Sequence, residues 1–182
     1  MYISNARPGQ PPYEKVMRRV MNRGGATALA VGDVMAFDVD ASDAATQALS
    51  GVKGNTVSTL IEAMYSNIVN VGAAPLNAEI CVVVDLLDGE GADDTEVVVQ
   101  VIGQVTAKVG GTNWSTAYSS CGVAVMADTT GANRRLVAAA DGANRGKNGF
   151  IAEAIDTNLS SSNATAQVVL FGFGSSVGSV GA

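Results

Sequence analysis

The sequence predicts an all-β body built from two similar β units, and three observations support this fold class. Short apolar runs rich in β-branched residues are bounded by Gly, Asp, Asn and Ser along much of the 182-residue chain, which is typical of strands joined by turns. Residues 95–109 alternate between apolar and polar positions after a run of valines, as a half-buried strand does. Two long stretches also resemble each other, which indicates an internal repeat.

The repeat joins residues 79–103 to residues 150–174, and the two stretches align without a gap. A similar short run precedes each copy, at 31–38 and at 121–128. The matched pairs are Ile80 with Ile151, Asp85 with Asp156, Val97 with Val168, Val98 with Val169, Gly103 with Gly174, Gly32 with Gly122, and Asp38 with Asp128. Each unit is expected to contain a short strand, a connection and a hairpin-like pair of strands. The alternative is a chance likeness between sequences rich in Gly, Ala and Val.

These patterns divide the chain into an arm, a body and a tail. We expect an extended N-terminal arm over residues 1–28, a β body over 29–176 and a flexible tail over 177–182. Within the body, the first unit covers 29–110 and carries an insertion, and the second unit covers 111–176. Three prolines near the start favour an extended conformation in the arm.

Two segments have the apolar spacing of a short amphipathic helix. Residues 56–69 place apolar side chains at i, i+3 and i+4 positions, although an irregular strand ending at Asn70 is the alternative. Residues 12–22 also fit a short helix, with valines and methionines on one side and arginines on the other. Any helix is therefore expected within one of these two segments.

The N-terminal arm differs in charge from the rest of the chain. Residues 1–23 hold five of the eleven basic residues and one acidic residue, a net charge of +4, which leaves −10 for the remainder. Because the arm has apolar side chains but no core of its own, it is expected to order on another subunit; a disordered terminus is the alternative. The candidate partner-binding residues are Arg7, Tyr13, Met17, Arg18, Arg19 and Arg23.

The composition argues against catalysis, nucleic-acid binding and membrane insertion. Histidine is absent, which removes the usual general base and the commonest transition-metal ligand. The acidic body lacks the basic stripe of a nucleic-acid surface, and no apolar run reaches transmembrane length. Cys81 lies inside an apolar run and is expected to be a buried thiol. We therefore expect no enzyme activity, no catalytic residue, no cofactor, and neither a nucleic-acid nor a membrane partner.

Two acidic turns contain oxygen ligands of the kind that Ca²⁺ prefers. Residues 85–96 contain six acidic residues, and residues 38–43 contain three. The EF-hand spacing is not met, and the second copy of the repeat replaces the first cluster with Ser, Thr and Asn. Turns that bond their own backbone are the better interpretation, so we expect no metal site, with calcium binding as the alternative.

Three motifs follow one another in this sequence. They are "GDVMAFDVD" at 32–40, "ICVVVDLLDGEGADDTEVVVQVIGQVTAKV" at 80–109, and "VAVMADTTGANRRLVAAADGANRGKNGFIAEAID" at 123–156. Their order resembles the capsid decoration (cement) proteins of tailed bacteriophages over roughly residues 30–175. The resemblance implies a small β-barrel or β-tulip body, often a homotrimer, seated on the outside of the phage head where capsomers meet. It brings no catalytic residues.

The resemblance predicts a structural virion protein that decorates the head and cements contacts between capsomers. Its expected partners are the major capsid protein and further copies of itself, and its expected location is the capsid surface after assembly in the host cytoplasm. The alternatives are a tail or baseplate structural protein, and a carbohydrate- or surface-binding β module. The last needs exposed aromatic side chains, of which Trp114 and a few tyrosines are the candidates.

Overall fold

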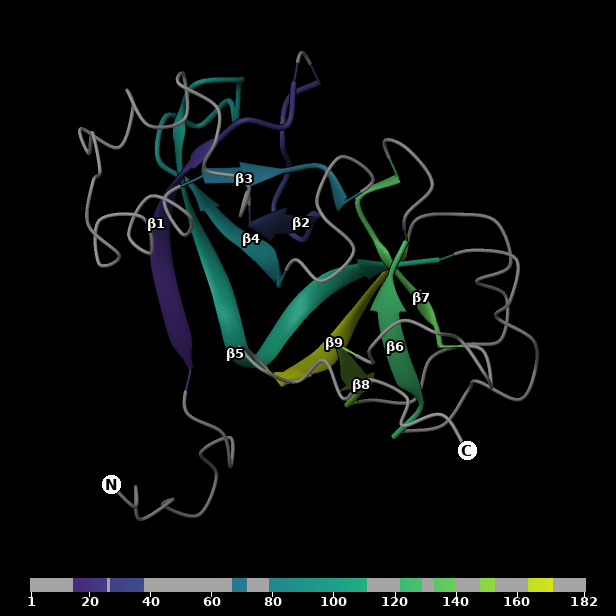
Figure 1. Cartoon of the computed structure of the whole chain (residues 1–182). Coiled ribbons are helices and arrows are strands. Elements are labelled where there is room, and N and C mark those ends of the chain that lie inside the picture. Colours follow the sequence, from purple (N-terminus) through teal and green to yellow (C-terminus); the bar gives the residue numbers. More distant parts are fainter. Residues whose placement is uncertain are drawn as a thin grey trace, which may run out of the picture.

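The all-β prediction is confirmed by a computed structural model that describes the chain in several segments. These are residues 15–25, 27–37, 67–71, 79–110, 122–128, 133–139, 148–152 and 164–171. Every regular element within them is a strand (Figure 1). The strands are β1 (Val16–Asn22), β2 (Val34–Phe37), β3 (Asn67–Val69), β4 (Ile80–Leu86), β5 (Glu96–Val109), β6 (Ala124–Ala127), β7 (Leu136–Ala138), β8 (Gly149–Ile151) and β9 (Ala164–Phe171). The described segments contain no helix with the length and apolar character to cross a membrane.

The helix predicted over 12–22 is wrong where the structure describes that segment. Val16–Asn22 forms β1, which pairs antiparallel with β5. The helix predicted over 56–69 is also wrong at its C-terminal end, because Asn67–Val69 forms β3; residues 56–66 lie outside the described segments. In both places a neighbouring strand supplies partners for the backbone groups, and this pairing overrides the helical spacing of the apolar side chains.

Strand β1 brings much of the predicted N-terminal arm into the body. Its register with β5 extends from Val16 opposite Ile102 to Met21 opposite Glu96. Residues 1–14 of the predicted arm lie outside the described segments. The body of the protein therefore starts at β1 rather than near residue 29.

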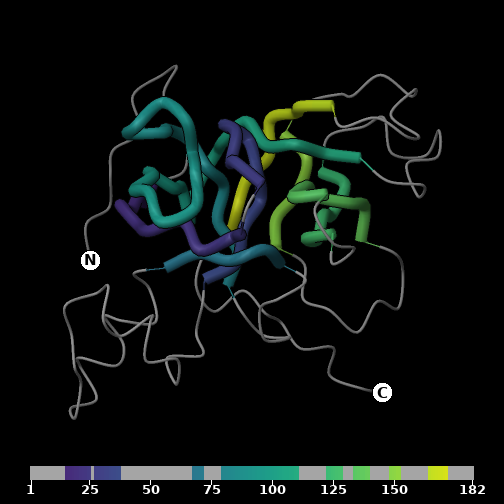
Figure 2. The backbone as a smooth tube through the Cα atoms, turned by 90° about the horizontal axis from the view of Figure 1, so that it is seen from above, coloured from purple at the N-terminus to yellow at the C-terminus, as the bar shows by residue number. Residues whose placement is uncertain are grey.

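The strand pairings close into two rings of five strands that share β5. The N-terminal ring follows the order β1-β3-β2-β4-β5 and closes through the pairing of β5 with β1. The C-terminal ring follows the order β5-β7-β6-β8-β9 and closes through the pairing of β9 with β5. Seen from above, the two rings lie side by side (Figure 2).

The C-terminal ring repeats the N-terminal ring pairing by pairing. The β1–β3 and β5–β7 pairs are parallel, and the four remaining pairs of each ring are antiparallel. The strands also follow one another along the chain in the same order in both rings, with the second part of β5 taking the place of β1. The body is therefore built from two similar β units, as the internal repeat predicts.

Backbone hydrogen bonds identify the residues that correspond in the two units. The Gly32 N–H donates to the Val83 C=O at 2.8 Å, and the Gly122 N–H donates to the Ile151 C=O at 2.7 Å. The two glycines have φ angles of 92° and 88°, so the match between them is confirmed. The match of Ile80 with Ile151 is wrong, because Ile151 takes the place of Val83. Strand β4 contains a register shift, and successive apolar residues in both copies are similar. The sequence alone therefore does not show whether Ile151 corresponds to Ile80 or to Val83.

Strand β5 bends where it passes from one ring to the other (Figure 1). Its residues up to Ile102 pair with β1 and β4, and those from Ile102 onward pair with β9. Gly103 has a φ of 92°, a conformation that residues with a Cβ atom rarely adopt. The buried Gln100 side chain donates from Nε2 to the C=O groups of Ile102 and Gln104, at 3.0 and 2.9 Å. Gln100 therefore satisfies carbonyl groups that flank the bend.

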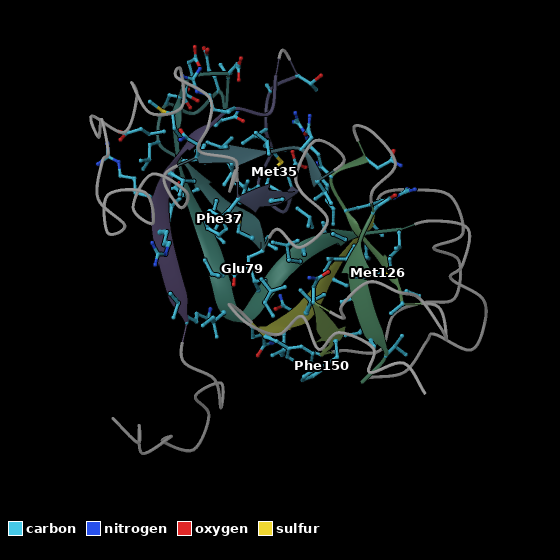
Figure 3. The ribbon with its side chains drawn as sticks, viewed as in Figure 1. Met35, Phe37, Glu79, Met126 and Phe150 are labelled. Atoms are coloured by element: carbon cyan, nitrogen blue, oxygen red, sulfur yellow. The ribbon has the colours of Figure 1, made fainter. Side chains whose placement is uncertain are left out.

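Each ring encloses an apolar cluster of its own, and β5 contributes to both. Met35 and Phe37 are the largest fully buried side chains and lie in the N-terminal ring (Figure 3). The prediction for Cys81 is confirmed: its thiol is fully buried in the same cluster, and burial raises its pKa far above the ordinary value. From β5, Val97, Val99 and Val101 face the first cluster, and Val105, Ala107 and Val109 face the second.

The bend in β5 gives the first testable prediction. Gly103→Ala should lower the free energy of unfolding by about 1–2 kcal/mol, because an L side chain is strained at this positive φ. Urea unfolding followed by circular dichroism measures the change as a shift of the midpoint at constant slope. Thr165→Ala, at an exposed position of β9, is the control and should shift the midpoint little. Equal midpoints for wild type and Gly103→Ala would show that the bend does not depend on glycine.

Candidate partner-binding surface

Four of the six predicted partner-binding residues lie on or just after β1. Met17 is 53% exposed, and Arg18 and Arg19 are exposed beside it. Arg23 follows the last residue of the strand. The other two, Arg7 and Tyr13, lie outside the described segments.

Two of these arginines form ion pairs within the chain. Arg19 pairs with Glu96, and both side chains are largely exposed. Arg23 pairs with Asp94, and its side chain is mostly covered. Exposed ion pairs contribute little stability, about 0–1 kcal/mol. They nevertheless neutralise part of the positive charge that the sequence places at the start of the chain.

The acidic turn between β4 and β5 is held against β1 by a buried side chain. Asn22, the last residue of β1, is fully buried. Its Nδ2 donates to the C=O groups of Gly91 and Ala92 at 3.0 and 2.9 Å, and its Oδ1 accepts the Gly24 N–H at 2.8 Å. The positive end of β1 and the negative turn therefore lie together as one folded unit.

The carboxylates of this turn have structural partners. Asp88 accepts the backbone N–H groups of Glu90 and Gly91 at 3.0 and 2.9 Å. The hydrogen bonds from Gly91 and Glu90 lower the pKa of Asp88, because they favour the charged form. Asp93 accepts the Gly25 N–H at 3.2 Å. Within the described segments, no group of three or more His, Cys, Asp or Glu side chains is arranged to hold a metal ion.

The first part of β1 is a strand edge with a basic character. Among the described residues, Val16 to Val20 pair with β5 on one side only, and the pairing of β1 with β3 begins at Met21. Backbone groups on an edge of this kind are available to an extended segment of another chain. The edge therefore offers main-chain hydrogen bonds next to exposed Met17 and Arg18.

The sequence did not reveal a buried polar cluster at the junction of the two rings. Asp33 is 2% exposed and Arg134 is 4% exposed. Asp33 forms an ion pair with Lys108 of β5 and lies 3.6 Å from Arg134 Nη1. Its Oδ2 also accepts the Ala30 N–H at 2.9 Å. The cluster thus joins the loop before β2 to the C-terminal ring.

Arg134 holds the loop before β2 through carbonyl groups. Its guanidinium donates to the C=O groups of Thr27 and Ala28 at 2.8 and 2.9 Å, and to that of Gly24 at 3.3 Å. Its Nε donates to Asn70 Oδ1 at 2.7 Å. Four of the five N–H donors of the guanidinium are used in this way, and Nη1 also lies 3.6 Å from Asp33 Oδ2, so these contacts give Arg134 a structural role. No spacing in the sequence marks Arg134, because its partners are mostly backbone groups of distant residues.

Other candidates from the sequence lie outside the described segments. These are the acidic turn at 38–43, the aromatic residues Trp114 and Tyr118, and the second cysteine, Cys121.

The junction gives a prediction for stability. Arg134→Met should lower the free energy of unfolding by about 3 kcal/mol or more, because several buried carbonyl groups lose their donor and buried Asp33, which keeps Lys108, loses its second basic neighbour. Arg135→Met is the matched control: Arg135 pairs with Asp128 at 2.9 Å and is more exposed, so a smaller loss is expected. Urea unfolding of both variants makes the comparison. Similar losses at the two positions would contradict the special role of Arg134.

A second prediction concerns calcium. Millimolar calcium should leave the melting temperature of the purified protein nearly unchanged, because the carboxylates of Asp88, Asp93 and Asp94 already bind backbone N–H groups or an arginine. Differential scanning calorimetry with calcium and with a chelator measures the shift. A rise of many degrees at submillimolar calcium would show a site that these contacts do not reveal.

Comparison with known proteins identifies no relative for this arrangement. No protein-family model matches the chain, and no curated protein matches it either.

Proposed function

We propose that the chain is a structural virion protein that decorates the outside of a phage head and cements contacts between capsomers. The order of its sequence motifs supports this role, as does a body whose described polar clusters hold loops in place. Such a protein acts by adding interface area between subunits, and it needs a rigid body with segments that reach neighbouring subunits.

One observation carries the proposal: the two ends of the described body meet at one place. Val16 of β1 and Phe171 of β9 both lie opposite Ile102 of β5 in the strand registers. The terminal segments, residues 1–14 and 172–182, therefore join the described body at the same end. Two segments attached to one end of a rigid double ring can bind one surface together.

The residues proposed to bind the shell come from the start of the chain. Met17, Arg18 and Arg19 are exposed on β1, and Arg7 and Tyr13 belong to the preceding segment 1–14. Arg23, whose side chain is mostly covered, contributes less in this proposal. The partner is the major capsid protein, whose many copies on one shell strengthen the attachment of multivalent or oligomeric binders.

Truncation tests the proposal. Removal of residues 1–14 should leave the body folded, because β1 and all its described pairings remain. Binding to undecorated phage heads should fall by at least about tenfold, since the contacts of the segment are lost. Co-sedimentation with heads measures binding, and circular dichroism with thermal melting verifies the fold.

Two comparisons sharpen this test. Removal of residues 1–22 should unfold the N-terminal ring, because it deletes β1 itself. Removal of 172–182 is the matched truncation at the other terminus and should weaken binding less, since those residues have no basic side chain. Undiminished binding without residues 1–14 would refute the proposed attachment. Binding to tails in place of heads would favour a tail or baseplate role.

A further inference from the structure

The contact between the two rings of one chain buries an outer row of the N-terminal ring. The row crosses β2, β4 and β5 through Val34, Val82 and Gln100, which are neighbours in the strand registers. Their exposed fractions are 0%, 0% and 1%. Val34 and Val82 belong to the apolar cluster of the C-terminal ring, so this row is covered by a ring of the same fold.

The C-terminal ring has the corresponding row on its own outer side. It crosses β6, β8 and β9 through Ala124, Phe150 and Val169, again as neighbours in the registers. Ala124 and Phe150 are partly exposed, whereas Val169 is buried, at 4% exposed; Phe150 lies at the lower margin of the body in Figure 3. Phe171 on the same side of β9 is 44% exposed, and its ring centroid is 5.7 Å from that of Phe150.

The two rows occupy corresponding positions in the two rings, but they differ in burial and in side-chain type. At the position of Val82 in the N-terminal ring, the C-terminal ring carries the larger and aromatic Phe150. Aromatic side chains supply much of the binding energy in protein interfaces and are costly to leave in water. The row is fully covered in the first unit but only partly covered at Ala124 and Phe150 in the second, so a ring of the same fold is the occupant that the repeat itself suggests.

We propose that this row, with Ala124, Phe150 and Phe171, binds the N-terminal ring of a second copy of the chain. The contact would repeat between two chains the packing that joins the two rings within one chain. It is a head-to-tail contact, since the C-terminal ring of one copy meets the N-terminal ring of the next. Such contacts form closed oligomers when the rotation between copies closes, and otherwise form open chains.

The strand of the second copy that meets the row is β1. Within one chain, the first strand of the covering ring is β5 from Gly103 onward, and its Val105 lies opposite Val168 of β9. The corresponding strand of the N-terminal ring is β1, where Arg18 lies opposite Val99 of β5. Arg18 is exposed, and by this correspondence it would take the place of Val105, which belongs to one apolar cluster with Val34 and Val82. In that place its guanidinium would lie near Phe150, where a cation–π contact suits an aromatic row better than an aliphatic one.

Analytical ultracentrifugation of the purified protein tests this inference without phage particles. The wild-type protein should associate with increasing concentration, and Phe171→Asp should weaken association by at least about tenfold, because a charge enters the apolar row. Leu87→Asp is the matched control, since Leu87 is 45% exposed but lies in the turn after β4. A wild-type protein that stays monomeric at high concentration, or equal effects of the two variants, would overturn the inference.

A mixing experiment tests the head-to-tail geometry. Phe171→Asp removes the C-terminal surface, and Arg18→Glu removes the N-terminal surface, so neither variant should associate alone. An equimolar mixture should form a dimer of one copy of each, because each variant retains the surface that the other lacks. Thermal melting confirms that both variants are folded. Association of Arg18→Glu by itself would show a symmetric contact between aromatic rows, and a mixture without dimers would also refute the proposed pairing.

Association and shell binding can fail independently. The inference does not depend on the proposed function, because it concerns purified protein alone. A chain that associates but does not bind heads would contradict only the virion proposal, and a monomer that binds heads would contradict only the ring contact.

Discussion

The structure depends on one strand that serves two rings. The first part of β5 completes the N-terminal ring, and its second part begins the C-terminal ring. A strand cannot do this while it stays straight, so the backbone turns at Gly103, where φ is 92°. The bend leaves carbonyl groups near the centre of the molecule, and Gln100 satisfies two of them from within the same strand. Because buried polar groups without a partner are costly, the glycine and the glutamine are required together.

The shared strand also brings charges into the interior. Since the two rings are joined through β5, the loop before β2 lies between β5 and Arg134, which comes shortly before β7. The Gly32 C=O accepts the Lys108 N–H, and the Val34 N–H donates to the Arg134 C=O, each at 2.8 Å. The guanidinium of Arg134 donates to the carbonyl groups of Thr27 and Ala28 in this loop, and Asp33 balances the buried positive charge. The ionic cluster is thus a consequence of the doubled fold and does not indicate a reaction centre.

The sequence predicted those features that depend on local pattern and missed those that depend on distant partners. Strand character, the internal repeat and the buried thiol of Cys81 follow from runs of β-branched and small residues. Strand β1 was misread as a helix because its valines and methionines have helical spacing, whereas pairing with β5 decides its conformation. The predicted residue-by-residue match between the two units was wrong because a run of valines gives similar matches in more than one register. The role of Arg134 could not be predicted because its partners are mostly backbone carbonyl groups, which every residue has.

A repeat joined through a shared strand has an inherent asymmetry between its two units. The first unit has its outer row covered by the second, whereas no described segment forms a third unit over the row of the second, beside which Phe171 is 44% exposed. Natural repeat arrays meet this problem with terminal units that have a polar outer face. Here the terminal row instead carries Phe150 beside Phe171, so the chain retains at its end the apolar character of an internal contact. Phe171 also lies opposite Ile102, next to the start of β1. The open row and the attachment of residues 1–14 therefore adjoin, which allows contacts between copies and contacts with a shell to reinforce each other at the same end of the body.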